Sequence, residues 1–228
     1  MAAERCYIIG VDEAGRGSIV GEMMVAAIAV PHDESKLLVE LGVKDSKLLT
    51  PNSRSRLYRE LSSRYPFAVV PVRPWEIDEE NLNALTAKAA SLAVSVVAER
   101  VGGFQRVCGV YVDRFGDPGK LRVMLRLRGY KGSLIVEEKA DLRYPVVGAA
   151  SIIAKHVRDR RIRVLRSIYG VEGSGYPSDP RTMEWVRRVL SSGVTPPIIR
   201  YSWESLRDTP YYKPKRKKPA KVTLEDFF

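Results

Sequence analysis

The chain has 228 residues, with 38 Lys or Arg against 27 Asp or Glu, so its formal net charge is +11. This length suits one domain with a full hydrophobic core and a small appendage, and the positive charge favours a polyanionic partner. Two histidines, His32 and His156, are too few and too far apart for a zinc site, and no apolar run is expected to span a bilayer. The sequence has no signal peptide pattern, so we expect a soluble intracellular protein in which Cys6 and Cys108 are buried free thiols.

The apolar patterns predict strands and helices in alternation, which indicates a mixed sheet flanked by helices. Thr50 can cap a helix whose first residue is Pro51, and Asp33 can cap the helix before it. Pro71 cannot donate to a sheet ladder, so its strand is expected at an edge. In chain order the predicted elements are strands at 7–11 and 23–30, helices at 34–41 and from 51 onward, a strand at 67–72, a buried helix at 82–101, strands at 107–113 and 134–141, and helices at 144–168 and 181–190.

Two adjacent carboxylates and a glycine turn follow the first predicted strand. Asp12 and Glu13 come at its end, and Gly15-Arg16-Gly17 comes directly afterwards. Because successive side chains of a strand point to opposite faces, the two acids share one direction only if the chain bends, and the glycines allow a bend. Two acids that leave a core are costly to desolvate, so a bound divalent cation is expected to compensate them.

The same turn has an alternative interpretation as a dinucleotide-binding loop. A pyrophosphate cradle needs a helix N-terminus and no neighbouring anions. Here Asp12 and Glu13 stand directly before the glycines, and an apolar strand follows them. The charges at the turn therefore disfavour nucleotide binding.

Carboxylates also follow two later apolar runs, at Asp113 and at Asp141. Each acid could simply cap or solvate the end of its strand. In an open sheet flanked by helices, however, strand ends that share an edge gather at one site, where four acids would raise one another's pKa values. Magnesium prefers oxygen ligands, so the pattern predicts a magnesium site at the edge of the sheet.

Several short motifs follow one another along the chain. They are Asp-Glu-Ala-Gly-Arg-Gly at 12–17, Asp-Ser-Lys-Leu at 45–48, Val-Asp at 112–113, Ala-Asp at 140–141, Ala-Ala-Ser-Ile-Ile-Ala-Lys at 149–155 and Gly-Ser-Gly-Tyr-Pro-Ser-Asp-Pro at 173–180. In order and mutual spacing, from about Tyr7 to Pro180, they resemble the motifs of the ribonuclease HII family, and the last of them has the archaeal form.

The resemblance implies an α/β fold of the ribonuclease H type, with a mixed five-stranded sheet flanked by helices and a helical C-terminal extension. It implies a catalytic domain at 1–170, the packed helical extension at 171–210, and a basic flexible tail at 211–228.

The resemblance also implies an endoribonuclease that uses Mg²⁺ or Mn²⁺, with two ions per active site. Members of the ribonuclease HII family cleave the RNA strand of RNA·DNA hybrids and nick 5′ of ribonucleotides embedded in duplex DNA, leaving a 3′-hydroxyl and a 5′-phosphate. Such activity serves ribonucleotide excision in DNA repair and primer RNA removal in replication. As candidate metal ligands, Glu137 and Glu138 rank below Asp141, because the family's ligand at this point of the chain lies just before the long helix. The catalytic residues and metal ligands carried over are Asp12, Glu13, Asp113 and Asp141.

The resemblance carries over a substrate-binding set as well. The turn at Gly15, Arg16 and Gly17 would contact the ribose 2′-hydroxyl, the group that separates RNA from DNA. Tyr176 would pack against the next sugar, although without the resemblance it is an ordinary loop aromatic. The further members are Asp45, Ser46 and Lys47, whose lysine would meet a phosphate, and Ser151 and Lys155, which lie four apart on one helix face.

Arg158 and Arg161 follow Lys155 on the same predicted helix. They could continue a track of phosphate contacts, but a solvated basic face is the preferred interpretation for these arginines.

The end of the chain predicts a basic linker and then a short binding peptide. Leu224, Phe227 and Phe228 fall at i, i+3 and i+4, so one helical turn places all three on one side, as in groove-binding peptides. The peptide resembles the segment by which replication and repair proteins bind the ring-shaped sliding clamp, with Lys221 where that motif usually has Gln. In the alternative, Phe227 and Phe228 fold back on the protein's own core.

Two other functions are weighed against the endoribonuclease. A binder of structured RNA without chemistry is disfavoured by the intact set of four acids. A different nuclease of the same fold, such as a resolvase, is disfavoured by Gly15-Arg16-Gly17 and Tyr176, since a DNA nuclease has no use for a ribose sensor. We further expect a cytoplasmic monomer that makes no membrane contact.

Overall fold

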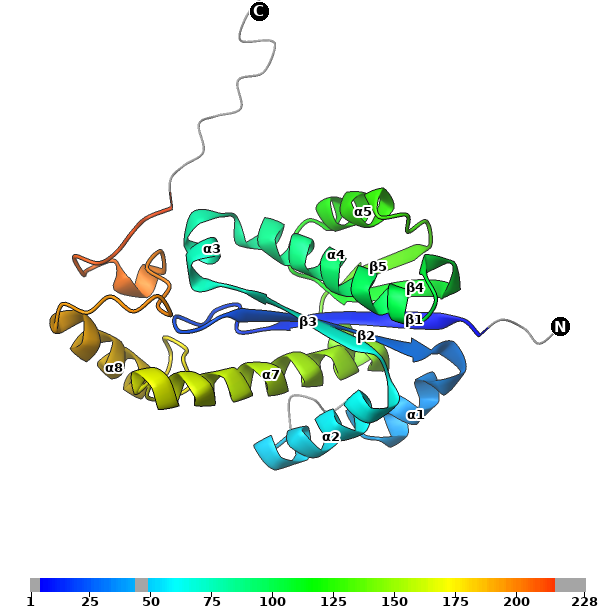
Figure 1. The fold of residues 1–228 in the computed structure, drawn as a ribbon, viewed down its shortest axis with the longest axis horizontal. Helices are drawn as coiled ribbons and strands as arrows, with labels where there is room; N and C mark the ends of the chain where they lie inside the picture. The colour runs from blue at the N-terminus through cyan, green and yellow to red at the C-terminus, as the bar shows by residue number, and fades with distance from the viewer. Residues whose placement is uncertain (1–4, 44–48, 216–228) are drawn as a thin grey trace, which may run out of the picture.

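The computed structural model describes residues 5–43 and 49–215. Its centre is one five-stranded sheet in the order β3-β2-β1-β4-β5 (Figure 1). β2 runs antiparallel to both β1 and β3, whereas β4 runs parallel to both β1 and β5. The predicted mixed five-stranded sheet is therefore confirmed. The strands are β1 (Tyr7–Ala14), β2 (Met23–Pro31), β3 (Phe67–Val72), β4 (Val107–Asp113) and β5 (Ser133–Glu137).

Helices cover both faces of this sheet (Figure 1). One face carries α4 (Leu82–Arg100) and α5 (Pro118–Leu127). The other face carries α7 (Pro145–Tyr169) together with α1 (Ser35–Glu40) and α2 (Pro51–Arg64). The remaining elements are η1 (His32–Glu34), α3 (Pro74–Glu79), η3 (Phe104–Arg106), α6 (Ala140–Arg143), α8 (Pro180–Ser191) and η4 (Glu204–Leu206).

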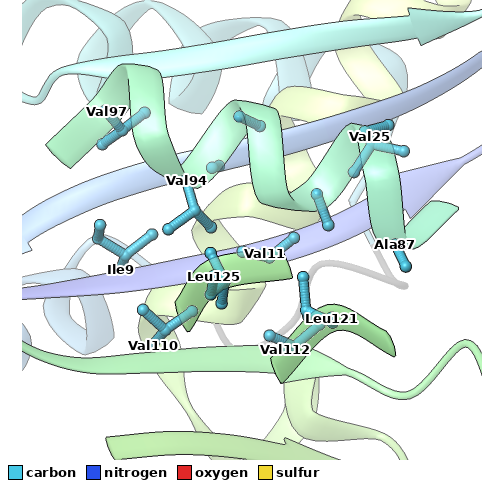
Figure 2. Packing of buried hydrophobic residues seen from close by; sticks show 14 of the residues in the cluster. Ile9, Val11, Val25, Ala87, Val94, Val97, Val110, Val112, Leu121 and Leu125 are labelled. Atoms are coloured by element: carbon cyan, nitrogen blue, oxygen red, sulfur yellow. The ribbon is translucent and has the colours of Figure 1, made fainter. Parts of the chain in front are cut away.

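Alternate positions of the two central strands fill separate cores. Ile9 and Val11 of β1 pack with Val110 and Val112 of β4 under α4 and α5 (Figure 2). The residues between them face α7, as strand geometry requires. Among the described helices, α4 is long and apolar enough to cross a membrane, judged by length and composition only. Most of it is buried in this core, as predicted for a buried helix.

The face toward α7 depends on a close approach of two backbones. A Cβ atom at Gly10 would lie 2.0 Å from the carbonyl oxygen of Val146, far inside van der Waals contact. Glycine therefore allows the first turn of α7 to lie directly on β1. This contact fixes the position of α7 beside the carboxylates that follow on β1.

The chain after α7 packs through a third apolar cluster. Ile19 and Val20, which follow the glycine turn, share this cluster with Leu165 of α7 and Trp185 of α8. An isolated antiparallel bridge also joins Val20 to Ile199. The C-terminal extension thus lies against the loop between β1 and β2.

Two local predictions need correction, while a third is confirmed. Thr50 caps α2 by accepting a hydrogen bond from the Ser53 amide at 3.2 Å. Asp33 does not cap α1, because it lies inside the 3₁₀ turn η1 and faces Arg5 at 3.6 Å. The strand predicted to reach Asp141 stops at Glu137, where the chain leaves the sheet. Asp141 belongs to α6 instead.

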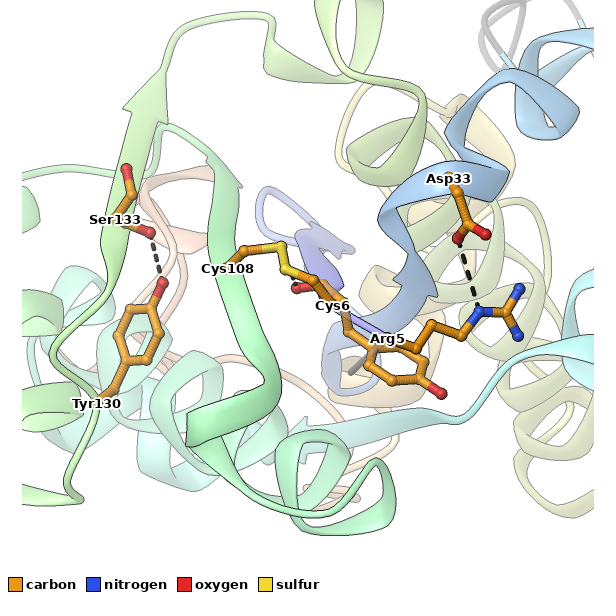
Figure 3. Close-up of a disulfide and its surroundings, with 7 residues drawn as sticks. Arg5, Cys6, Asp33, Cys108, Tyr130 and Ser133 are labelled. Atoms are coloured by element: carbon orange, nitrogen blue, oxygen red, sulfur yellow. Dashed lines mark hydrogen bonds and ion pairs between the residues drawn. A yellow bond between two sulfur atoms is a disulfide. The ribbon is translucent and has the colours of Figure 1, made fainter. Parts of the chain in front are cut away.

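Cys6 and Cys108 form a disulfide, so the predicted pair of buried free thiols is wrong (Figure 3). Cys6 directly precedes β1, and Cys108 is an exposed residue of β4. Parallel pairing of these strands brings the two Cα atoms to 5.9 Å, a separation that a disulfide spans. The pairing joins residues 102 positions apart, so local sequence patterns could not reveal it.

Candidate active site

Asp12 and Glu13 lie within β1, where they point to opposite faces of the sheet. The strand continues through Ala14, so the bend falls after the two acids and not between them. The Glu13 amide donates to Asp12 Oδ1 at 2.7 Å. Asp12 shares its face with α7, whereas Glu13 lies on the α4 face, with its Oε1 3.7 Å from Arg16.

Asp113 ends β4 on the same face as Asp12. The parallel register pairs Val11 with Val112, so Asp12 and Asp113 occupy the next positions of neighbouring strands. Asp113 Oδ1 accepts a hydrogen bond from the Ala140 amide at 2.8 Å. This bond ties the first turn of α6, including the buried Asp141, to the end of β4.

Burial and mutual repulsion raise the pKa values of two of these carboxyls, those of Asp12 and Glu13. Burial raises the pKa of Asp12 to about 7, with a further contribution from Asp113, while Ser151 and Lys155 oppose the rise. Burial also raises the pKa of Glu13 to about 8, helped by Asp12 and Asp113 and opposed by Arg16. Such shifts occur where charge is concentrated for function.

The acids are not preassembled as a metal-ligand set. No group of three or more His, Cys, Asp or Glu side chains in residues 5–43 and 49–215 is arranged to hold a metal ion. Asp12 Oδ1 accepts from the Glu13 amide and Asp113 Oδ1 accepts from the Ala140 amide, so the backbone orients both carboxylates. Oxygen donors that repel one another in a buried site still fit a hard divalent ion.

Ser151 and Lys155 of α7 support the Asp12 side of the site, on one helix face as predicted. Ser151 is fully buried, and its hydroxyl lies near enough to Asp12 to lower that pKa. Its geometry nevertheless falls short of a regular hydrogen bond with any described group. Lys155 is partly exposed and also lowers the pKa of Asp12.

The glycine turn follows directly after β1. Gly15 has φ +82°, a conformation in which other residues are strained, and its carbonyl oxygen accepts from the Ser18 amide at 3.2 Å. The Arg16 side chain turns inward, donating to Thr86 Oγ1 at 3.0 Å and to the Phe115 carbonyl at 3.2 Å. Any substrate contact at Arg16 is therefore expected from its backbone. Gly17 is exposed.

Tyr176 lies beside this turn because its loop is bonded to it. The Gly175 carbonyl accepts from the amides of Ile19 at 2.9 Å and Val20 at 3.1 Å. The Arg158 guanidinium stacks on the Tyr176 ring at 4.4 Å. The turn and the tyrosine, which lie about 160 residues apart in sequence, are thus held as one surface.

Arg158 and Arg161 differ from the predicted solvated face, because both are engaged with other parts of the protein. Arg158 is buried and donates to Ser18 Oγ at 3.2 Å, so it is part of the scaffold under the turn. Arg161 forms an ion pair with Glu22 at 2.8 Å. The predicted residues Asp45, Ser46, Lys47, Lys221, Leu224, Phe227 and Phe228 lie outside the described residues.

Sequence reasoning missed Arg200 and Trp203, which contact the turn from the C-terminal extension. Arg200 has no exposed surface, and its guanidinium donates to the Gly15 carbonyl at 2.8 Å. Both residues follow a helix in an irregular segment with no periodic pattern. No feature of the sequence marks them as neighbours of Gly15.

Comparisons with known proteins agree on one family. The family model described as Ribonuclease HII matches residues 9–206. The ribonuclease HII of Aeropyrum pernix is 52% identical over 201 residues, covering 88% of this chain and 88% of that protein. The ribonuclease HII of Hyperthermus butylicus is 43% identical over 212 residues, covering 91% and 86%.

Solved structures give the same result. Ribonuclease H2 from Pyrococcus horikoshii OT3 has a TM-score of 0.78 at 39% identity, covering 88% of this chain and 95% of that chain. The ribonuclease HII of Archaeoglobus fulgidus, solved in a complex with PCNA, has a TM-score of 0.75 at 33% identity, covering 96% and 99%.

The mixed sheet, the helices on both faces and the acidic sheet edge place the chain among enzymes with a ribonuclease H fold. The family model and the relatives match most of the chain, which narrows this class to one family. The chain belongs to the ribonuclease HII family, and it is a ribonuclease H that acts on RNA–DNA hybrids.

Proposed function

We propose that this enzyme is a metal-dependent endoribonuclease that cleaves the RNA strand of hybrids and nicks 5′ of ribonucleotides embedded in duplex DNA. The observation that carries the proposal is the contact between the acidic edge and the glycine turn. Ala14 alone separates Glu13 from Gly15 in the chain, and Tyr176 is held beside that turn. A ribose sensor and a charged site thus share one surface.

We propose that Asp12, Glu13, Asp113 and Asp141 would hold Mg²⁺ or Mn²⁺, with two ions per site. The raised pKa values of Asp12 and Glu13 support this, because both carboxylates lack full compensation in the protein alone. When bound, such ions supply an activated water and stabilise the leaving oxygen, which would give 3′-hydroxyl and 5′-phosphate products.

The chain's own side chains would position the nucleic acid. The exposed backbone of the turn can approach a ribose closely, since Gly17 has no side chain to collide with it. Tyr176, fixed by Arg158, would pack on the adjacent sugar. Lys155 carries a positive charge beside Asp12, where a phosphate would enter. Lys47 is proposed to meet a further phosphate.

A duplex with one embedded ribonucleotide tests the proposed function. With Mg²⁺ or Mn²⁺, we expect a single nick on the 5′ side of the ribonucleotide, and no nick in EDTA or in the all-DNA duplex of the same sequence. Mapping the ends by denaturing electrophoresis checks the position. Cleavage of the all-DNA control at a similar rate, or an intact ribonucleotide strand, would refute the proposal.

We also propose that the peptide at 221–228 binds a sliding clamp, with Leu224, Phe227 and Phe228 in a hydrophobic groove. The support is the i, i+3, i+4 spacing and the relative from Archaeoglobus fulgidus that was solved in a complex with PCNA. Deleting residues 221–228 should leave cleavage of free substrate unchanged and weaken clamp binding at least about tenfold.

Calorimetric titration of a clamp with the full chain and the deletion checks this expectation. A Lys221→Gln variant is the matched control, because it restores the usual motif and should bind at least as tightly as the unmodified chain. Equal clamp affinity for the deletion and the full chain would contradict the assignment.

A further inference from the structure

Arg200 lies fully buried beneath the glycine turn, in the segment that follows α8. Its guanidinium donates to the carbonyl oxygens of Gly15 at 2.8 Å and Arg16 at 2.9 Å. It also donates twice to the Gly21 carbonyl, at 2.9 and 3.1 Å. One side chain therefore holds the first two residues and the far end of the loop.

Trp203 completes this set of contacts. Its indole N–H donates to the Gly17 carbonyl at 3.4 Å, and its ring lies 5.0 Å from the Arg200 guanidinium. The carbonyl oxygens of Gly15, Arg16 and Gly17 therefore all accept from two side chains of the C-terminal extension. Hydrogen bonds to these carbonyl oxygens thus hold the turn in place.

The segment that carries Arg200 is itself fixed from two sides. Asp78 of α3 accepts from the amides of Tyr201 and Ser202, each at 2.9 Å. The Arg200 amide donates to the Ile19 carbonyl at 2.9 Å. The guanidinium is thus placed by a rigid support rather than by its own flexible stem.

The buried charge is costly, which argues for a role beyond packing. Burial lowers the pKa of Arg200 to about 9, and Arg158 contributes to the shift. Within residues 5–43 and 49–215, no carboxylate forms an ion pair with Arg200, so its direct contacts are with backbone carbonyls and the Trp203 ring. An apolar residue would fill this space at a lower desolvation cost.

The consequence for the turn follows from peptide geometry. In a trans peptide, the C=O of one residue and the N–H of the next point in opposite directions. Drawing the Gly15 and Arg16 carbonyls inward therefore directs the amides of Arg16 and Gly17 outward. No described residue accepts a hydrogen bond from these two amides. They are donors facing the surface where Gly17 is exposed.

We propose that Arg200 and Trp203 are positioning residues for ribose recognition, which fix the two peptide planes between Gly15 and Gly17 so that their amides meet the 2′-hydroxyl. The inference rests on the proposed function, in which this turn contacts the ribose. It makes the C-terminal extension part of the specificity machinery, although neither residue touches the substrate.

Arg200→Lys tests the proposal, because lysine keeps the charge but cannot reach three carbonyls at once. The readout is the ratio of affinities for a duplex with one ribonucleotide and for the all-DNA duplex, measured with Ca²⁺ in place of Mg²⁺. We expect this ratio to fall at least about fivefold, as for the loss of a well-aligned hydrogen bond, while affinity for all-DNA duplex is retained. The amide NMR signals of Arg16 and Gly17 should shift as well.

Two further variants keep the test decisive. Trp203→Phe keeps the ring over Arg200 and removes only the donor to Gly17, so it should lower the ratio less than Arg200→Lys does. If Arg200→Lys does not fold, Trp203→Phe decides the question alone. Arg100→Lys is the matched control, since Arg100 donates to the Phe67 carbonyl at the opposite end of the sheet and should leave the ratio unchanged.

The outcomes separate the two proposals. If the unmodified enzyme shows no preference for the ribonucleotide duplex, the proposed function fails and the inference falls with it. If the enzyme shows the preference and a folded Arg200→Lys variant, or a folded Trp203→Phe variant where Arg200→Lys is unfolded, retains it in full, only the positioning inference is overturned.

Discussion

Asp12→Asn is expected to abolish turnover while making the metal-free protein more stable. Burial raises the pKa of Asp12 to about 7, so an ionised Asp12 opposes folding. Asparagine has nearly the same shape, carries no charge and can still accept the Glu13 amide that now binds Oδ1. The pKa shift of Asp12 corresponds to at most about 4 kcal/mol of folding free energy, and coupling to Glu13 reduces this figure. We therefore expect the substitution to raise the free energy of unfolding by roughly 1–3 kcal/mol at pH 8.

The pH dependence of this gain has a defined sign. A carboxyl whose folded pKa lies above its ordinary value stabilises the fold at low pH, and that stability is lost as the pH rises through the folded pKa. The advantage of Asp12→Asn should therefore be absent near pH 4 and complete near pH 8. Denaturant unfolding of the two proteins in EDTA at both pH values measures it.

The catalytic part of this expectation follows from the role proposed for Asp12. Loss of a metal ligand should lower kcat by about 10³-fold or more, which corresponds to several kcal/mol of transition-state stabilisation. Asp33→Asn is the matched control, because that side chain is 70% exposed and lies at the far end of β2. Retention of more than a tenth of kcat, or a lower stability than the parent at pH 8, would contradict the role assigned to Asp12.

Gly10→Ala is expected to destabilise the whole protein. The new Cβ atom would lie 2.0 Å from the Val146 carbonyl oxygen, which belongs to the backbone of α7 and cannot rotate away. Relief requires α7 to move off β1, which opens the core on that face. We expect a loss of roughly 3 kcal/mol or more, at the upper end of the cost of overpacking and a large share of typical stability.

Gly17→Ala is the matched control for stability, since no atom lies within 4 Å of a Cβ built there. Urea unfolding of both variants should show a normal midpoint for Gly17→Ala and a strongly lowered midpoint for Gly10→Ala. Movement of α7 also displaces Ser151 and Lys155 from Asp12, so any folded Gly10→Ala protein should have low activity. Equal midpoints for the two variants would show that the backbone contact is not limiting.

Local sequence patterns were enough to predict most of the strands and helices. The apolar runs that became β1, β2, β3 and β4, the Thr50 cap and the proline at the edge strand each depend on a few neighbouring residues. Asp12, Glu13 and Asp113 could be identified as one group because each lies near the end of a predicted strand. The electrostatic coupling of these three carboxyls is consistent with that expectation.

Other features depended on contacts between distant segments. Asp141 belongs to α6 because the Asp113 carboxylate holds the Ala140 amide, a bond that no local pattern indicates. The basic neighbours of Arg158 predict a solvated side chain, yet Arg158 is buried and donates to Ser18. The disulfide required β1 and β4 to be adjacent, and a strand order cannot be read from spacing alone.

Hydrophobic periodicity and turn chemistry act over a few residues, so local patterns are enough to predict the α/β class, most strands and helices, and the carboxylates and glycines that could form a site. How that site is supported depends on contacts that exist only in the folded chain. The orientation of the glycine turn depends on Arg200, which follows it by 185 residues and bonds to its carbonyl oxygens. Such a contact arises only when the C-terminal extension packs against the loop after β1, since burial and hydrogen bonding are properties of the assembled fold.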